Sequence, residues 1–210
     1  MSICGRESEV VPKIDQDRLW QTHMDMAEIG ATNGGGVCRL ALSDEDKNSR
    51  DLFVKWAEEA GCEVRIDKVG NIFARRRGEK PELPPVMTGS HLDTQPLGGR
   101  FDGAYGVLAG LEAVRALNDL NLQTRHPIDI VVWTDEEGCR FTTKTMGSAV
   151  FSGLCKEADV LNGLDPDDKR FGDELARIGY AGSEPCGGIP IKAFFEAHIE
   201  QGPILEKEGI

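Results

Sequence analysis

A histidine and two carboxylates lie close together in the middle of the chain. His91 follows the apolar residues Val86 and Met87, so we place it near the C-terminal end of a buried strand, where ligands gather in open α/β sheets. Asp93 lies on the same side of an extended backbone, and Asp102 follows a loop rich in glycine. A carboxylate at position 93 can accept the second ring N–H of a metal-binding histidine. This spacing predicts part of a metal site, although a satisfied core histidine and a helix N-cap would give the same pattern.

Two glutamates and a second histidine follow two further predicted strands. Glu136 and Glu137 come after the apolar run 128–133, and His198 lies in the run 191–200. Imidazole and carboxylate groups are ligands for zinc, manganese or cobalt, and a carboxylate can bridge two ions about 3.5–4 Å apart. Adjacent glutamates point in different directions, so one can bind metal while the other acts as a general base. The ordinary alternatives are a solvated acidic loop for the glutamates and a core histidine for His198.

The strands and helices that must position these residues can be predicted from the sequence patterns. Together they indicate an α/β fold, with a mixed sheet flanked by helices. Residues 63–67 and 71–75 flank a turn and predict a hairpin. The continuous apolar run 128–133 is typical of a strand covered on both faces. Further strands are expected before His91 and at 191–200. Helical periodicity predicts helices at 15–30, 43–61, 103–118, 147–153, 172–179 and 202–209.

Composition and charge limit which kinds of partner the protein can bind and where in the cell it can reside. The 210 residues carry a net charge of −12, which disfavours nucleic acid and anionic membranes as partners. No apolar run approaches the roughly 20 residues that span a bilayer, and residues 1–7 lack the apolar core of a signal peptide. The six cysteines form no C-x-x-C pair, a pattern that suits reduced thiols. We therefore expect a cytoplasmic protein with no nucleic-acid or membrane partner.

Four segments of the chain, in this order, resemble one group of enzymes. They look like the hydantoinase/carbamoylase branch of the dinuclear-zinc aminoacylase and carboxypeptidase-like metallohydrolases. This branch includes N-carbamoyl-L-amino-acid hydrolases, β-ureidopropionases and allantoate amidohydrolases. The segments are GSHLDT at 89–94, GGRFDG at 98–103, DEEGCRF at 135–141 and HIEQGP at 198–203.

The resemblance implies two divalent metal ions, zinc with manganese or cobalt as alternatives. Carried over by position, His91, Asp102 and His198 would hold one ion. Asp102 and Glu137 would serve the other, with Asp102 as the bridge between them.

The resemblance also implies the reaction, which is hydrolysis of a linear amide or ureido C–N bond. For an N-carbamoyl-L-amino acid the products are the amino acid, ammonia and carbon dioxide. Glu136 would be the general base, Asp93 would orient His91, and Gln201 would contact the substrate. An N-acyl amino acid or a peptide is the alternative substrate. A truncated, non-catalytic metal-binding fragment is the alternative from another class.

The chain departs from this pattern in its length, because family members are about twice as long. In the family a histidine near the C-terminus completes the second metal, and an inserted lid domain supplies dimer contacts. The other two histidines here, His23 and His126, are not placed like that ligand. We therefore expect residues 1–210 to be the N-terminal portion of the catalytic domain, without the inserted domain and the C-terminal part. The full-length family member is expected to be a homodimer.

Overall fold

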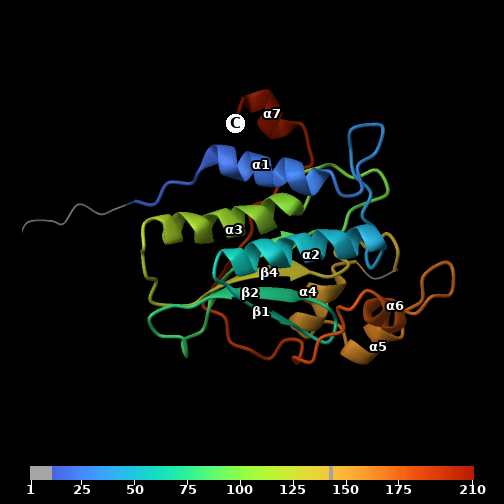
Figure 1. The fold of residues 1–210 in the computed structure, drawn as a ribbon. Coiled ribbons are helices and arrows are strands. Elements are labelled where there is room, and N and C mark those ends of the chain that lie inside the picture. Colours follow the sequence, from blue (N-terminus) through green and yellow to red (C-terminus); the bar gives the residue numbers. More distant parts are fainter. Residues whose placement is uncertain (1–10, 142–143) are drawn as a thin grey trace, which may run out of the picture.

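A mixed five-stranded sheet forms the centre of the fold in the computed structural model, which describes residues 11–141 and 144–210 (Figure 1). The strands are β1 (Glu63–Ile66), β2 (Ile72–Arg76), β3 (Val86–His91), β4 (Ile128–Trp133) and β5 (Ala193–Phe195). Their order in the sheet is β1-β2-β4-β3-β5. β3 is parallel to β4 and β5, whereas β2 is antiparallel to β1 and β4. The predicted α/β fold with a mixed sheet is confirmed.

The predicted hairpin joins β1 to β2, with Ile66 opposite Ile72. The side chain of Asp67 closes the turn, because its Oδ1 accepts the N–H groups of Val69 at 3.1 Å and of Asn71 at 2.9 Å. Gly70 has a φ of +84°, a left-handed conformation that favours glycine. Local sequence therefore fixes this hairpin.

The helices of the described residues are α1 (Gln16–Ala27), α2 (Asp44–Glu59), α3 (Ala104–Asp119), α4 (Met146–Phe151), α5 (Glu157–Leu161), α6 (Phe171–Arg177) and α7 (Ile204–Glu208). The side chains of Asp15 and Ser43 accept the N–H groups of Arg18 and Asp46, so α1 and α2 begin where capping residues predict. The remaining predicted helices also form, and α5 is an addition that the sequence did not predict.

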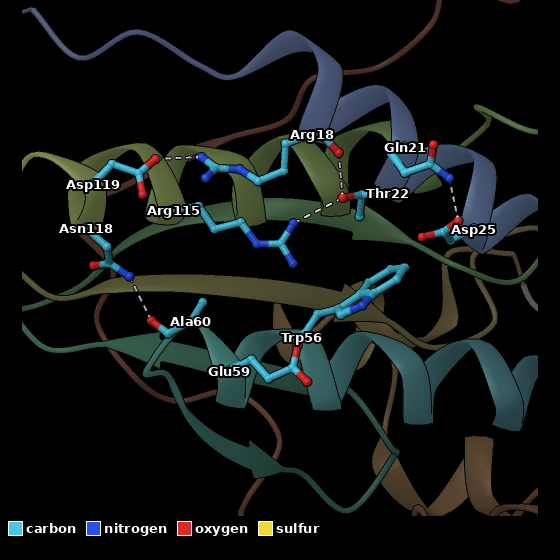
Figure 2. Close-up of a pocket in the computed structure, with 10 residues that line it drawn as sticks. All are labelled: Arg18, Gln21, Thr22, Asp25, Trp56, Glu59, Ala60, Arg115, Asn118 and Asp119. Carbon is cyan, nitrogen blue, oxygen red and sulfur yellow. Dashed lines mark hydrogen bonds and ion pairs between the residues drawn. The ribbon is translucent and has the colours of Figure 1, made fainter.

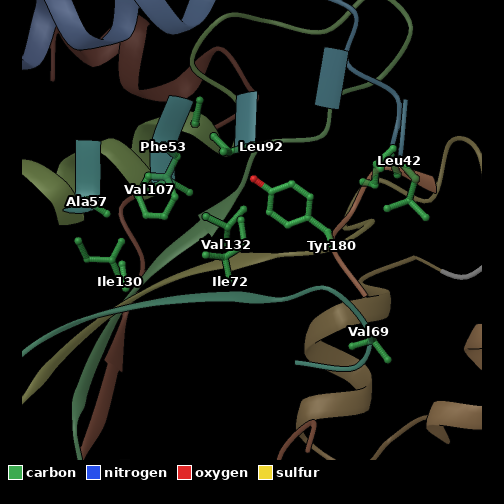
Figure 3. Packing of buried hydrophobic residues seen from close by; sticks show 14 of the residues in the cluster. Leu42, Phe53, Ala57, Val69, Ile72, Leu92, Val107, Ile130, Val132 and Tyr180 are labelled. Carbon is green, nitrogen blue, oxygen red and sulfur yellow. The ribbon is translucent and has the colours of Figure 1, made fainter. Parts of the chain in front are cut away.

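Alternating residues of the central strands build a core on each face of the sheet. One face packs against α2 and α3, and α1 lies against α3 farther from the sheet (Figure 1). Ile72, Ile130 and Val132 point into this larger core (Figure 3). The other face carries a smaller cluster with Phe151 of α4 packed against it, made of Phe73, Met87, Val131 and Trp133. Burial on both faces confirms the interpretation of the continuous apolar run 128–133.

The predicted strand at 191–200 is shorter than its sequence suggests. Only Ala193–Phe195 is extended, paired with β3 from Val86 to Thr88. Beyond that point the Ser90 hydroxyl bonds to the carboxylate of Glu196, so a side chain replaces the next backbone pair. His198 therefore lies in irregular chain after β5 rather than within a strand.

Two predictions from composition concern the whole chain. In the described part, no helix combines the length and the apolar character needed to cross a membrane. The cysteines at positions 38, 62, 139, 155 and 186 are free thiols. Cys4 and the predicted absence of a signal core fall on residues 1–10, which lie outside the described residues.

Candidate metal centre

Three side chains that are distant in the sequence converge beyond the C-terminal ends of β3 and β5. One ligand atom each of His91, Asp102 and His198 lies within 4.8 Å of the other two. His91 ends β3, Asp102 lies just before α3, and His198 follows β5. His91 and Asp102 are buried, whereas His198 is exposed. The structure therefore brings together the three residues predicted to hold the first metal.

Each of the three side chains has an atom free for a metal. His91 Nδ1 lies 2.8 Å from the carbonyl of Asp93, and His198 Nδ1 lies 2.9 Å from the carbonyl of Ile199. In a neutral imidazole the nitrogen that faces a carbonyl carries the proton, which leaves the Nε2 lone pair available to a metal. Within the part of the chain that the structure describes, Asp102 Oδ1 is buried without a hydrogen-bond partner, and it lies 3.3 Å from His198 Nε2. Two imidazole nitrogens and a carboxylate oxygen fit a zinc ion.

Gly103 makes room for the His91 ring. A Cβ atom at this position would overlap the ring atoms of His91, and the φ of +62° is left-handed. Gly103 is also the N-cap residue of α3, and no side chain caps this helix. The ordinary alternative for Asp102, a helix N-cap, is therefore wrong.

The adjacent glutamates point in different directions, as predicted. Glu136 Oε2 lies 3.4 Å from His91 Nε2, and its side chain is partly exposed. Glu137 lies outside the three-residue group, and its Oε1 is buried with no hydrogen-bond partner in the described part of the chain. Its Oε2 accepts a hydrogen bond from Gln95 at 3.1 Å. No sequence pattern singles out Gln95, because it is one polar residue within a loop.

Asp93 contacts His91 through its main-chain carbonyl, and not through its carboxylate as predicted. The main-chain carbonyl of Asp93 faces His91 Nδ1, and the carboxylate oxygen lies farther away, at 3.8 Å. The two carboxylate oxygens instead accept the N–H groups of Glu136 and Glu137, each at 3.2 Å. Because these donors lie after β4, the carboxylate turns toward the neighbouring strand. Burial raises the pKa of Asp93 to about 6.

Asp93→Asn should weaken zinc affinity about 10–100-fold, the usual size of an effect from a residue that supports a ligand. An amide presents an NH2 group where the carboxylate accepts a backbone N–H, so the glutamate segment would shift. Competition with a chelator measures the affinity. Asp67→Asn is the matched control, because Asp67 is equally buried and also accepts two backbone N–H groups in the hairpin turn. Unchanged zinc affinity in Asp93→Asn would contradict this role.

Gln201 touches a predicted metal ligand. Its side-chain amide donates to Asp102 Oδ2 at 2.6 Å. Together with both glutamates and His198 it lines a cleft of about 290 Å³. Its predicted contact with a substrate stays a prediction.

Asp135 is a buried carboxyl group directly before the two glutamates. It is 0% exposed, its φ is +49°, and neither carboxylate oxygen has a hydrogen-bond partner among residues 11–141 and 144–210. Burial, reinforced by the charges of Asp93 and Asp46, raises the pKa of Asp135 to about 9. The folded protein therefore holds Asp135 protonated at neutral pH.

This pKa predicts a pH-dependent gain in stability for Asp135→Asn. Between its unfolded pKa of about 4 and its folded pKa of about 9, Asp135 ionises only in the unfolded state, so the folded state loses stability as pH rises. Asparagine does not ionise. We expect the variant's gain in unfolding free energy to be about 2–4 kcal/mol larger at pH 8 than at pH 5. Urea denaturation of the metal-free variant and parent at pH 5 and pH 8 measures their unfolding free energies. An equal difference between variant and parent at the two pH values would contradict the prediction.

A separate cleft of about 530 Å³ lies between α1, α2 and α3 (Figure 2). Its arginines already have partners: Arg18 pairs with Asp119 at 2.8 Å, and Arg115 donates to Thr22 at 3.1 Å. None of the predicted ligands lines this cleft.

The two remaining histidines lie outside the ligand group, as predicted. His23 packs against Phe101, with ring centroids 5.4 Å apart. His126 Nδ1 lies 2.7 Å from the carbonyl of Pro84.

Residues 87–210, more than half of the chain, match the family model of peptidase family M20/M25/M40. The chain belongs to this family. Among M20 relatives, an N-carbamoyl-L-amino-acid amidohydrolase of Rhizobium meliloti is 50% identical over 197 residues, covering 94% of this chain and 47% of the relative. A ureidoglycolate hydrolase of Arabidopsis thaliana is 36% identical over 206 residues, covering 94% of this chain and 43% of the relative.

A solved M20-like structure has the same fold. The amidase of the hydantoinase/carbamoylase family from Burkholderia multivorans superposes with a TM-score of 0.93 at 57% identity, covering 94% of this chain and 48% of that one. The chain thus spans about half the length of the curated relatives it matches.

Proposed function

We propose that this chain is part of a metal-dependent hydrolase that cleaves the ureido C–N bond of an N-carbamoyl-L-amino acid. The convergence of His91, Asp102 and His198 within 4.8 Å carries this proposal. The carboxylate of Glu136, 3.4 Å from the His91 ring, adds a base beside the ligands. The names of the relatives, which include N-carbamoyl-L-amino-acid amidohydrolases and ureidoglycolate hydrolases, support a ureido substrate.

The ligand residues divide between two ions. His91, Asp102 and His198 would hold the first, and Asp102 and Glu137 would hold the second. When bound, such metals lower the pKa of water toward about 7 and polarise a carbonyl oxygen. Zinc suits this mixture of imidazole and carboxylate, with manganese and cobalt as alternatives.

The protein's own residues would move the proton. Glu136 takes a proton from the attacking water and returns it to the leaving nitrogen. Asp93 holds the main chain of Glu136 and Glu137 through its carboxylate. Gln201 fixes one oxygen of Asp102 and would contact the substrate from the same cleft.

Product analysis tests the reaction. The zinc-, manganese- or cobalt-loaded full-length protein is incubated with N-carbamoyl-L-amino acids, ureidoglycolate and N-acetyl-L-amino acids. Release of ammonia from the ureido compounds is the expected result. Acetate release alone would favour the alternative N-acyl hydrolase. Metal binding without either product would favour the non-catalytic alternative.

The length of the relatives supports a proposal about domains. We place residues 1–210 in the N-terminal portion of the catalytic domain of a protein about twice as long. An inserted dimerisation and lid domain and the rest of the catalytic domain would follow. The full-length protein would be a cytoplasmic homodimer. The charge of −12 on residues 1–210 argues against nucleic-acid or membrane partners for this part of it.

The 210-residue chain should bind about one zinc ion tightly. It offers three ligands to the first ion but only Asp102 and Glu137 to the second, and a zinc site of this kind needs about three protein ligands and a water. Elemental analysis after extensive dialysis measures the number of zinc ions bound per chain. Two tightly held ions per chain would show that His23, His126 or a second chain supplies a further ligand.

A further inference from the structure

Arg39 is fully buried next to the strand end that carries His91. Its Nε donates to the carbonyl of Leu92 at 2.9 Å, and its Nη1 donates to the carbonyl of Ile29 at 3.1 Å. Both acceptors are main-chain carbonyls, whereas a buried guanidinium is normally offset by a directly bonded carboxylate. Burying this charge is costly, and among the described residues the guanidinium Nη2 is buried without a hydrogen-bond partner. The side chain of Arg39 therefore directs its two hydrogen bonds to the carbonyls of Leu92 and Ile29.

The main chain of Arg39 holds the same segment as its side chain. The Arg39 N–H donates to Thr94 Oγ1 at 2.8 Å, and the Arg39 carbonyl accepts the Thr94 N–H at 2.8 Å. With the bond to Leu92, one residue therefore fixes the chain on both sides of Asp93.

Asp93 transmits this restraint to the candidate metal centre. Its carbonyl faces His91 Nδ1 at 2.8 Å, and its carboxylate accepts the N–H groups of Glu136 and Glu137. We propose that Arg39 is a positioning residue, which fixes the peptides around Asp93 and thereby holds His91 with Nε2 directed at the metal. This inference rests on the proposed metal-binding role of His91.

Arg39→Met and Arg39→Lys test the proposal on the whole protein, with Arg76→Met as the matched control. Methionine keeps much of the length of arginine but donates no hydrogen bond. Lysine can reach one carbonyl but not two. Arg76 is also buried and also bonds to a main-chain carbonyl, that of Leu122 at 2.6 Å, but at the far end of α3. Zinc affinity by chelator competition, the visible absorption spectrum of the cobalt-substituted protein and thermal unfolding are measured for each variant, together with His91→Ala.

We expect both methionine variants to lose thermal stability, but only Arg39→Met to lose zinc affinity, by about 10–100-fold, with an altered cobalt spectrum. Arg39→Lys should fall between Arg39→Met and the parent in both readouts. If Arg39→Met does not fold, Arg39→Lys decides alone.

Parental zinc affinity and a parental cobalt spectrum in the folded Arg39 variant would overturn the proposal. An equal loss of zinc affinity in Arg76→Met would overturn it as well. Full zinc binding by His91→Ala would overturn the metal assignment and this inference with it. Loss of zinc in His91→Ala with a parental Arg39 variant would overturn this inference alone.

Discussion

Glu136→Gln should lower turnover of the full-length enzyme by about 10²–10⁴-fold while leaving its metal content unchanged. The Glu136 carboxylate lies 3.4 Å from His91 Nε2 and lines the cleft at the ligand group. Glutamine keeps the size of this side chain but cannot accept the proton of the attacking water. Steady-state ammonia release and elemental analysis on the same preparation measure both quantities.

Glu137→Gln is the matched comparison for this variant. Glu137 has one buried carboxylate oxygen without a hydrogen-bond partner among the described residues, and we assign this oxygen to the second metal. The amide should therefore lower metal occupancy, and turnover would fall because metal is lost. If Glu136→Gln lost as much metal as Glu137→Gln, the division of labour between these neighbours would be wrong.

Gly103→Ala should weaken zinc binding by about 100-fold or more, since it displaces a ligand ring and not only its support. An added Cβ would overlap the His91 ring, and the φ of +62° is itself strained for alanine. Relief requires movement of His91 or of the start of α3, and Asp102 adjoins that start. Chelator competition on the folded variant measures the loss.

Gly99→Ala provides the control for Gly103→Ala within the same loop. A Cβ at Gly99 would meet no atom within 4 Å, and its φ is not left-handed. We expect parental zinc affinity for this variant. Equal affinity in both alanine variants would mean that the His91 ring is not held as closely as the structure places it.

Much of the fold could be predicted because its signals are local. The caps at Asp15 and Ser43 and the turn at Gly70 depend on residues only a few positions away. β5 was predicted too long because a strand extends only as far as its partner pairs with it. Its pairing with β3 stops at Thr88, which no pattern within 191–200 could reveal.

The sequence by itself determined which metal-binding groups follow the predicted strands, because residue type and periodicity are local properties. His91 and His198 were predicted on that basis, Asp102 from the loop between them, and all three from the family resemblance. Which atom contacts which was decided by the tertiary structure. The parallel register that sets His91 opposite Trp133 brings Asp93 beside the backbone N–H groups that follow β4. Those donors bind the Asp93 carboxylate, so the main-chain carbonyl is left to orient His91. Arg39 acquires its role in the same way, through carbonyls at Ile29 and Leu92 that meet only in the folded chain.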